Sequence, residues 1–153
     1  MKDLRRKDRG ISNQEAIDLL CRAEYGILST VDEVHQPYGV PLSYVYKENA
    51  VYFHCALSGQ KLDNLVRNPK VSFTVVGQTK VLPEMFATEY ESAIVLGRAC
   101  EVTGNEWYEA LIGLLGKYSP DFVAEGKHYI WQKKDLTKVL KIEIDELYGK
   151  ARK

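Results

Sequence analysis

The stretch "FHCALSGQKLDN", residues 53–64, decides how this chain is interpreted. A strand-like run ends at His54 and Cys55, a turn of small residues follows, and a helical pattern then begins with Lys61 in its first turn. The first turn of a helix carries partial positive charge, so a lysine there costs some stability. A phosphate bound by the helix N–H groups and the lysine would offset that cost. The stretch therefore predicts either a phosphate site or a lysine that is simply solvated.

The helix after this turn has a predicted beginning and end. We expect Ser58 to cap it, which places Lys61 at its third position. Asn64 shares the more polar face with Lys61, and Pro69 ends the helix.

Strand patterns dominate the rest of the sequence. We expect six strands, at residues 25–31, 37–47, 50–56, 70–77, 91–103 and 137–146. In the third of them, alternation puts Val51 and Phe53 on one face and Tyr52 and His54 on the other. Gly97 within the fifth strand indicates a bulge or a sharp bend.

Helical patterns flank these strands. Ser12 and Glu15 form a capping box that starts a helix over 12–23. Two further helices are predicted at 105–120 and 126–134, and the first carries an apolar stripe at helical spacing: Trp107, Leu111, Leu114, Leu115 and Tyr118. Strands joined by short turns, with few crossover helices, predict a mainly β (α+β) fold. We expect residues 1–153 to form one domain, a six-stranded antiparallel β-barrel with peripheral helices.

Composition excludes several classes of function. The 21 basic and 21 acidic residues give a formal net charge of zero, which argues against a general nucleic-acid binder. No apolar run approaches the roughly 20 residues of a membrane span, and the charged segment 1–10 is not a secretory signal. The three cysteines form neither a disulfide framework nor a metal-ligand spacing, and no metal site is expected. A cytoplasmic protein is the natural interpretation.

At this point the residues carry a family resemblance. Four segments resemble the pyridoxamine 5'-phosphate oxidase-related flavoproteins, and in particular their nitroimidazole-resistance branch: "GILSTV" (26–31), "QPYGVPLSYVY" (36–46), "VYFHCALSGQKLDNLVRNPKVSFTVVG" (51–77) and "YESAIVLGRACEV" (90–102). The pattern FH-x-A-x-x-G-x-K-x-x-N is the most specific part, and the resemblance extends from about residue 5 to 152. It implies a split β-barrel fold of the FMN-binding type, and a homodimer with FMN in a cleft at the subunit interface.

The resemblance also implies which residues contact the flavin. Residues along the ring and its ribityl chain would be Leu28, Ser29 and Thr30. Residues at the polar edge of the ring would be Pro41, Leu42 and Ser43. Residues leading to the phosphate would be His54, Cys55 and Ala56, with Lys61 as the main cation and Asn64 beside it. Residues contributed by the partner subunit would be Glu91 and Ser92, and Trp131 would cap the ring.

The implied function is FMN-dependent transfer of electrons or hydride to a small organic acceptor, for example a nitroaromatic compound. His54 is the candidate catalytic residue, because a histidine titrates near neutrality and suits proton delivery; the alternative is a half-buried structural histidine. Cys55 is either a small buried hydrophobe or a redox-active thiol.

The sequence also departs from parts of the family. Vitamin-B6 oxidases hold FMN and substrate phosphate with several arginines, and that set is not found here, since Arg67 and Arg98 stand alone on their segments. Oxidation of pyridoxamine phosphate is therefore not the expected activity. The second class of function is a non-catalytic flavin carrier or sensor, or a split barrel that binds haem or deazaflavin.

Overall fold

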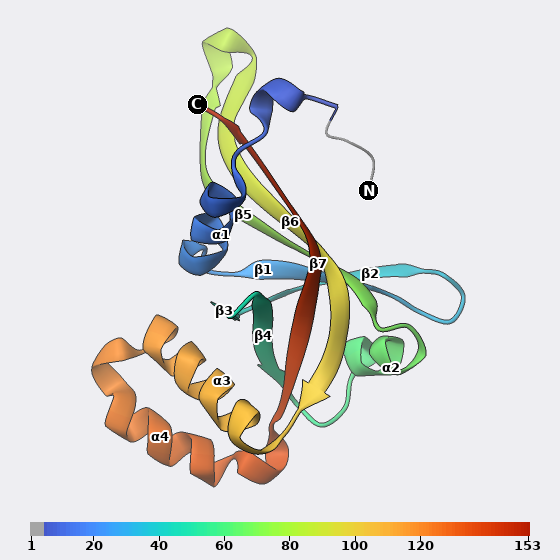
Figure 1. Ribbon diagram of the computed structural model, residues 1–153, viewed down its shortest axis with the longest axis vertical. Helices are drawn as coiled ribbons and strands as arrows, with labels where there is room; N and C mark the ends of the chain where they lie inside the picture. Colours follow the sequence, from blue (N-terminus) through green and yellow to red (C-terminus); the bar gives the residue numbers. More distant parts are fainter. Residues whose placement is uncertain (1–4) are drawn as a thin grey trace.

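One antiparallel sheet forms the body of the protein in the computed structural model, which describes residues 5–153 (Figure 1). The first residues of the charged N-terminal segment, 1–4, lie outside the described part. The sheet order is β2-β1-β5-β6-β7-β4-β3. Its strands are β1 (Gly26–Val31), β2 (Pro37–Leu42), β3 (Val45–Lys47), β4 (Ala50–Cys55), β5 (Lys70–Leu82), β6 (Ala87–Val102) and β7 (Lys138–Arg152).

Helices cover this sheet at several places. The α-helices among the described residues are α1 (Asn13–Arg22), α2 (Gln60–Arg67), α3 (Gly104–Tyr118) and α4 (Val123–Gln132), and short 3-10 turns occur at Lys7–Arg9, Pro83–Met85, Pro120–Phe122 and Lys134–Leu136. The predicted capping box of α1 is confirmed, with the Ser12 side chain accepting from the Glu15 N–H. The predicted helix pair near the C-terminus is also confirmed, and α3 and α4 lie side by side at one end of the molecule (Figure 1).

The expectation of six strands is wrong, whereas the antiparallel, split arrangement agrees with the prediction. The segment 37–47, expected as one strand, is divided at Ser43 and Tyr44 into β2 and β3, so the sheet has seven strands. The reason is that the Tyr44 backbone N–H donates to the hydroxyl of Tyr118, 3.0 Å away, instead of to a neighbouring strand. The two edge strands of the sheet are thus consecutive in the chain without being hydrogen-bonded, which leaves the barrel split.

The β5–β6 hairpin and β7 are longer than expected. β5 continues to Leu82 and β6 starts at Ala87, so the hairpin projects as an arm at the top of Figure 1. β7 extends to Arg152 because its residues pair with β6 along almost its whole length. The predicted irregularity at Gly97 is confirmed as a register shift between β6 and β7. A Cβ atom on Gly97 would lie 2.1 Å from the backbone oxygen of Glu143, so only glycine fits there.

β4 lies between two hydrophobic clusters, and this position builds the site. Val51 and Phe53 point into the main core, together with Leu28 of β1 and Phe73 of β5. The opposite face of β4 carries Tyr52, which packs in a second cluster beneath α3. The predicted alternation along β4 is therefore confirmed. His54 continues the Tyr52 face, so its side chain points toward the α3–α4 pair.

Candidate functional site

His54 lies near the end of β4, opposite Val139 of β7, and α2 begins six residues later at Gln60. Its ring is partly open to solvent, yet burial by surrounding atoms lowers the pKa of His54, and the nearby Lys61 ammonium lowers it further. A histidine in this environment is neutral at pH 7 and can accept a proton. His54 and Lys61 are therefore close enough for the lysine charge to disfavour protonation of the histidine.

Cys55 behaves as a buried thiol. It belongs to the main hydrophobic cluster, and burial raises its pKa. The charges of Lys61 and Lys138 act in the opposite direction and are outweighed. A raised pKa leaves little thiolate at neutral pH, so the geometry favours the packing interpretation of Cys55 over a reactive nucleophile.

α2 begins differently from the prediction. Its N-cap is Gly59 rather than Ser58, which places Lys61 at the second helical position instead of the third. The φ angle of Gly59 is 150°, a conformation that favours glycine, and this decides where the helix starts. Among the described residues, no side chain caps this helix. The backbone N–H groups of Leu62 and Asp63 donate to the Gly59 oxygen, so those of Gln60 and Lys61 are the ones left to an anion at this end of the helix.

Asn64 and Thr30 are bonded to each other. The Asn64 side-chain amide donates to the Thr30 hydroxyl at 2.9 Å, and both residues are buried. The Asn64 carbonyl oxygen also accepts from Gln60 at 2.8 Å. This pair fastens α2 to β1 and so positions the helix that carries Lys61. Leu28 is fully buried in the core. Cofactor contacts by these three side chains stay a prediction, while their packing is what the structure shows.

The remaining strand residues lie at the surface or half-exposed. Ser29 faces away from the core on β1, opposite Gly39 of β2, while Pro41 and Leu42 lie further along β2. Ser43, exposed at the break between β2 and β3, lines the same cavity as His54. Ala56 is exposed between His54 and α2. The structure thus brings Ser43, His54 and Lys61 to one region of the protein.

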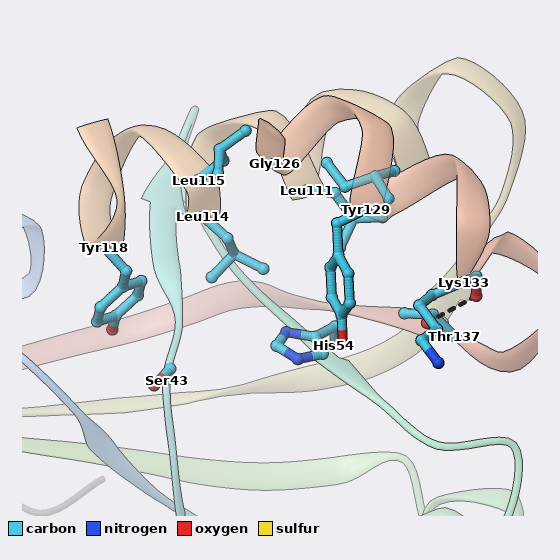
Figure 2. A pocket seen from close by; sticks show the side chains of 11 residues that line it. Ser43, His54, Leu111, Leu114, Leu115, Tyr118, Gly126, Tyr129, Lys133 and Thr137 are labelled. Carbon is cyan, nitrogen blue, oxygen red and sulfur yellow. Dashed lines mark hydrogen bonds between the residues drawn. The ribbon is translucent and has the colours of Figure 1, made fainter. Parts of the chain in front are cut away.

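A cavity of about 330 Å³ lies between α3, α4 and the end of β4 (Figure 2). Its apolar wall consists of Leu111, Leu114, Leu115 and Ile130, and the side chains with polar atoms around it are Ser43, His54, Tyr118, Tyr129, Lys133 and Thr137. Sequence reasoning missed this cavity, because it assigned the leucine stripe of α3 to packing alone. The signal that was available is the second short helix with Tyr129 and Lys133 one turn apart.

Glu91, Ser92 and Trp131 are not brought to His54 within one protomer. Glu91 pairs in register with Ala151 of β7, whereas His54 pairs with Val139. These β7 positions are twelve residues apart, which corresponds to roughly 40 Å of strand. Glu91 is held by Arg22 through two contacts of 2.6 and 2.5 Å.

Trp131 belongs to a separate aromatic group. Its ring stacks on Tyr108 with centroids 5.4 Å apart and lines another hollow, whereas its neighbour Ile130 faces the cavity beside His54. A contact between Trp131 and a flavin stays a prediction.

Two features are absent from the described part of the chain: a cluster of metal ligands and a membrane-spanning helix. Within residues 5–153, no group of three or more His, Cys, Asp or Glu side chains is arranged to hold a metal ion. Over the same residues, no helix combines the length and the apolar character that crossing a membrane requires.

Comparison with known proteins bears on the family and the fold of the chain. The profile of the family described as pyridoxamine 5'-phosphate oxidase matches residues 12–151. Among curated proteins, none matches the chain. A candidate 5-nitroimidazole antibiotic resistance protein from Bacteroides thetaiotaomicron is similar in structure, with a TM-score of 0.73 and 23% identity over 93% of this chain and 86% of that one.

Two further solved structures share the fold. An FAD-binding protein from Mesorhizobium loti has a TM-score of 0.68 and 25% identity, covering 95% of this chain and 98% of that one. An FAD- and haem-binding protein from Mycobacterium smegmatis has a TM-score of 0.81 and 18% identity, covering 93% and 72%. Both of these solved proteins are described as binding FAD, and their likeness to this chain is one of fold.

Proposed function

The chain belongs to the pyridoxamine 5'-phosphate oxidase family, and we propose that it binds FMN and acts as an oxidoreductase on a small organic acceptor, for example a nitroaromatic compound. The observation that carries the proposal is the junction of β4 and α2. There, an uncapped helix N-terminus and the Lys61 ammonium lie beside His54.

The residues at this junction fit a phosphate. Backbone N–H groups at a helix N-terminus point outward and favour negative charge. Lys61 adds a full positive charge, which explains a lysine at a position where it otherwise costs stability. Ser29, Pro41, Leu42 and Ser43 supply a polar backbone edge and hydroxyl groups for the ring system. FMN, when bound, would supply the electron- or hydride-transfer chemistry that these side chains lack.

His54 is the proposed proton-handling residue. Its lowered pKa keeps Nδ1 or Nε2 unprotonated at neutral pH, so the ring can take a proton and return it to an acceptor. Ser43 lies on the rim of the cavity that His54 enters and can orient a polar group there.

We also propose that the protein acts as a cytoplasmic homodimer. One face of β1, β5 and β6 is only partly buried and includes Ile27, Thr74 and Ile94 in register. Covering this face with a second copy would bury apolar surface, and Glu91 and Ser92, which lie far from His54 in one protomer, would contact a flavin from the partner subunit. Light scattering should give twice the 17.4 kDa chain mass; a single-chain mass with flavin bound contradicts the dimer.

The test of the function is the affinity for FMN. One charge-assisted hydrogen bond contributes about 1.5–3 kcal/mol, so Lys61→Ala should weaken FMN binding by roughly 10- to 150-fold in a flavin-fluorescence titration. Riboflavin lacks the phosphate and should bind the wild-type protein and Lys61→Ala about equally weakly. Lys70→Ala, which removes an exposed lysine just beyond α2, is the matched control and should bind FMN like wild type. Equal FMN affinity of Lys61→Ala and wild type would show the phosphate assignment to be wrong.

Haem, deazaflavin or FAD binding without catalysis is the second candidate function. A specific observation favours it, since His54 presents an imidazole to a cavity and one structural neighbour is described as binding FAD and haem. The absorbance spectrum of the purified protein separates haem, with its Soret band, from a flavin. Mass analysis of the group released on denaturation then separates FMN from FAD and deazaflavin.

A further inference from the structure

The cavity beside His54 has an apolar interior. Leu111, Leu114 and Leu115 of α3 form its wall together with Ile130 of α4. Figure 2 shows the three leucine side chains at the cavity. Gly126 of α4 brings the helices close together, because a Cβ atom there would lie 2.2 Å from a methyl group of Leu115. The shape of the cavity therefore depends on a specific helix contact and does not result from loose packing.

The polar side chains of the lining form two groups: Tyr118 and Ser43 lie on the left of Figure 2, and His54, Tyr129, Lys133 and Thr137 lie toward its right. Figure 2 shows Tyr129 reaching down to His54, with Lys133 and Thr137 beside them. The Thr137 hydroxyl is occupied, since it donates to the Lys133 backbone oxygen at 3.0 Å. Lys133 keeps its ammonium 6.0 Å from the centre of the Tyr129 ring.

The charges near His54, Tyr129 and Lys133 in this cavity are positive. Lys133 is the charged group among the residues that line the cavity, and none of the lining residues in the described chain is acidic. His54 is neutral at pH 7, and the charge that acts on it from α2 is the positive one of Lys61. A cation would meet repulsion here, whereas an anion would be attracted.

The size of the cavity limits its ligand. An apolar protein cavity of about 150 Å³ is large enough to hold benzene. The cavity of about 330 Å³ has room for one aromatic ring with a substituent, and not for a three-ring flavin in addition. Leucine side chains suit the faces of an aromatic ring, since they bury it without demanding hydrogen bonds.

We propose that this cavity binds a single-ring aromatic anion. The ring lies among Leu111, Leu114 and Leu115, and the anionic group lies at the Lys133 and Tyr129 end, beside His54. Binding of this ligand class follows from the cavity alone. Its role as the acceptor of the reaction rests on the proposed function.

The test uses 4-fluorobenzoate and the matched cation 4-fluorobenzylamine as probes, followed by ¹⁹F NMR on the full chain without added cofactor. Neither probe is an electron acceptor, so no turnover is needed. We expect saturable binding of 4-fluorobenzoate and at least tenfold weaker binding of 4-fluorobenzylamine. Lys133→Gln should weaken 4-fluorobenzoate binding by about 2- to 5-fold, the range of a solvent-screened charge contact. Lys134→Gln removes a neighbouring lysine outside the cavity and should leave the affinity unchanged.

A second set of experiments tests whether 4-fluorobenzoate binds inside this cavity. Leu114→Phe fills the cavity and should reduce 4-fluorobenzoate binding more than tenfold; circular dichroism checks that the variant folds. In the wild-type protein, nuclear Overhauser effects from the probe ring to the methyl groups of Leu111 and Leu114 locate the ligand without any substitution. Absence of these effects, or equal binding of the amine, overturns the proposal. An FMN titration of the same preparations reports on the proposed function, so the two can fail independently.

Discussion

The hydroxyl of Tyr118, at the end of α3, accepts a hydrogen bond of 3.0 Å from the backbone N–H of Tyr44. The same hydroxyl lies 2.5 Å from the backbone oxygen of Glu24, to which it donates. Tyr44 is itself fully buried, and its own hydroxyl donates to the Leu20 backbone oxygen. The Tyr118 side chain thus binds the backbone N–H of Tyr44, which would otherwise be free to pair with a neighbouring strand. This hydrogen bond holds α3 against the break between β2 and β3.

Replacing Tyr118 with Phe should destabilise the protein. The Tyr44 N–H and the Glu24 carbonyl would lose their partner, and an unsatisfied buried donor costs about 1–3 kcal/mol. Chemical denaturation should therefore show the free energy of unfolding reduced by that amount. Tyr129→Phe is the matched control, because its ring is exposed and the change should stay within about 0.5 kcal/mol. Equal stability of Tyr118→Phe and wild type would contradict the role given to this hydroxyl.

Removing the charge of Lys61 should raise the pKa of His54. Burial is the larger cause of the lowered pKa and would persist, while the contribution of the Lys61 ammonium would vanish in Lys61→Gln. An NMR titration of the His54 ring should therefore show a midpoint nearer to 6.5 than in the wild-type protein. An unchanged titration midpoint of His54 in Lys61→Gln would show that the Lys61 charge does not act on the His54 ring.

The same group makes stability depend on pH. Because the folded pKa of His54 lies below its unfolded value, the unfolded chain binds the proton more readily in mildly acidic solution. The contribution of His54 to stability is therefore present above pH 6.5 and is lost as the pH falls toward the lowered folded pKa. His54→Gln should lessen this acid sensitivity in denaturation experiments at pH 5 to 7.

Lys117 should be a destabilising residue at neutral pH. Its ammonium lies 3.8 Å from the centre of the Tyr44 ring and has no hydrogen-bond partner among residues 5–153. Burial lowers the pKa of Lys117 to about 8 from 10.5, although the nearby Cys21 acts in the opposite direction. The unfolded chain therefore holds this proton more tightly between pH 8 and 10.5, and the free energy of unfolding should rise with pH across that window.

Lys117→Met tests this directly. The thioether side chain keeps the packing and removes the buried unpaired charge, so we expect about 1–2 kcal/mol of added stability at pH 7. The gain over wild type should shrink between pH 8 and 10, since the wild-type lysine is then neutral. Lys127→Met, at an exposed position of α4, should change stability little at any pH. A loss of stability in Lys117→Met would mean that the cation–aromatic contact with Tyr44 outweighs the cost of burial.

Local patterns were enough to predict many features of this protein. The alternation along Val51–His54 depends on strand geometry alone, and the capping box of Ser12 and Glu15 spans three residues. Gly97 marks a bulge because no side chain fits against the neighbouring strand. The motif that contains His54 and Lys61 identified the family, since its spacing is read without knowledge of distant contacts.

Only the tertiary structure decided the features that depend on residues far apart in the sequence. The strand break at Tyr44 is caused by Tyr118, 74 residues later, and the interaction that occupies Asn64 involves Thr30, 34 residues earlier. The cavity beside His54 exists because α3 and α4 fold back over β4 with Gly126 at their contact. Sequence by itself determined most of the strand and helix segments and the place of the His54–Lys61 motif, because those preferences are set by neighbouring residues. How the barrel splits and where a ligand fits were decided by long-range packing, which no local pattern specifies.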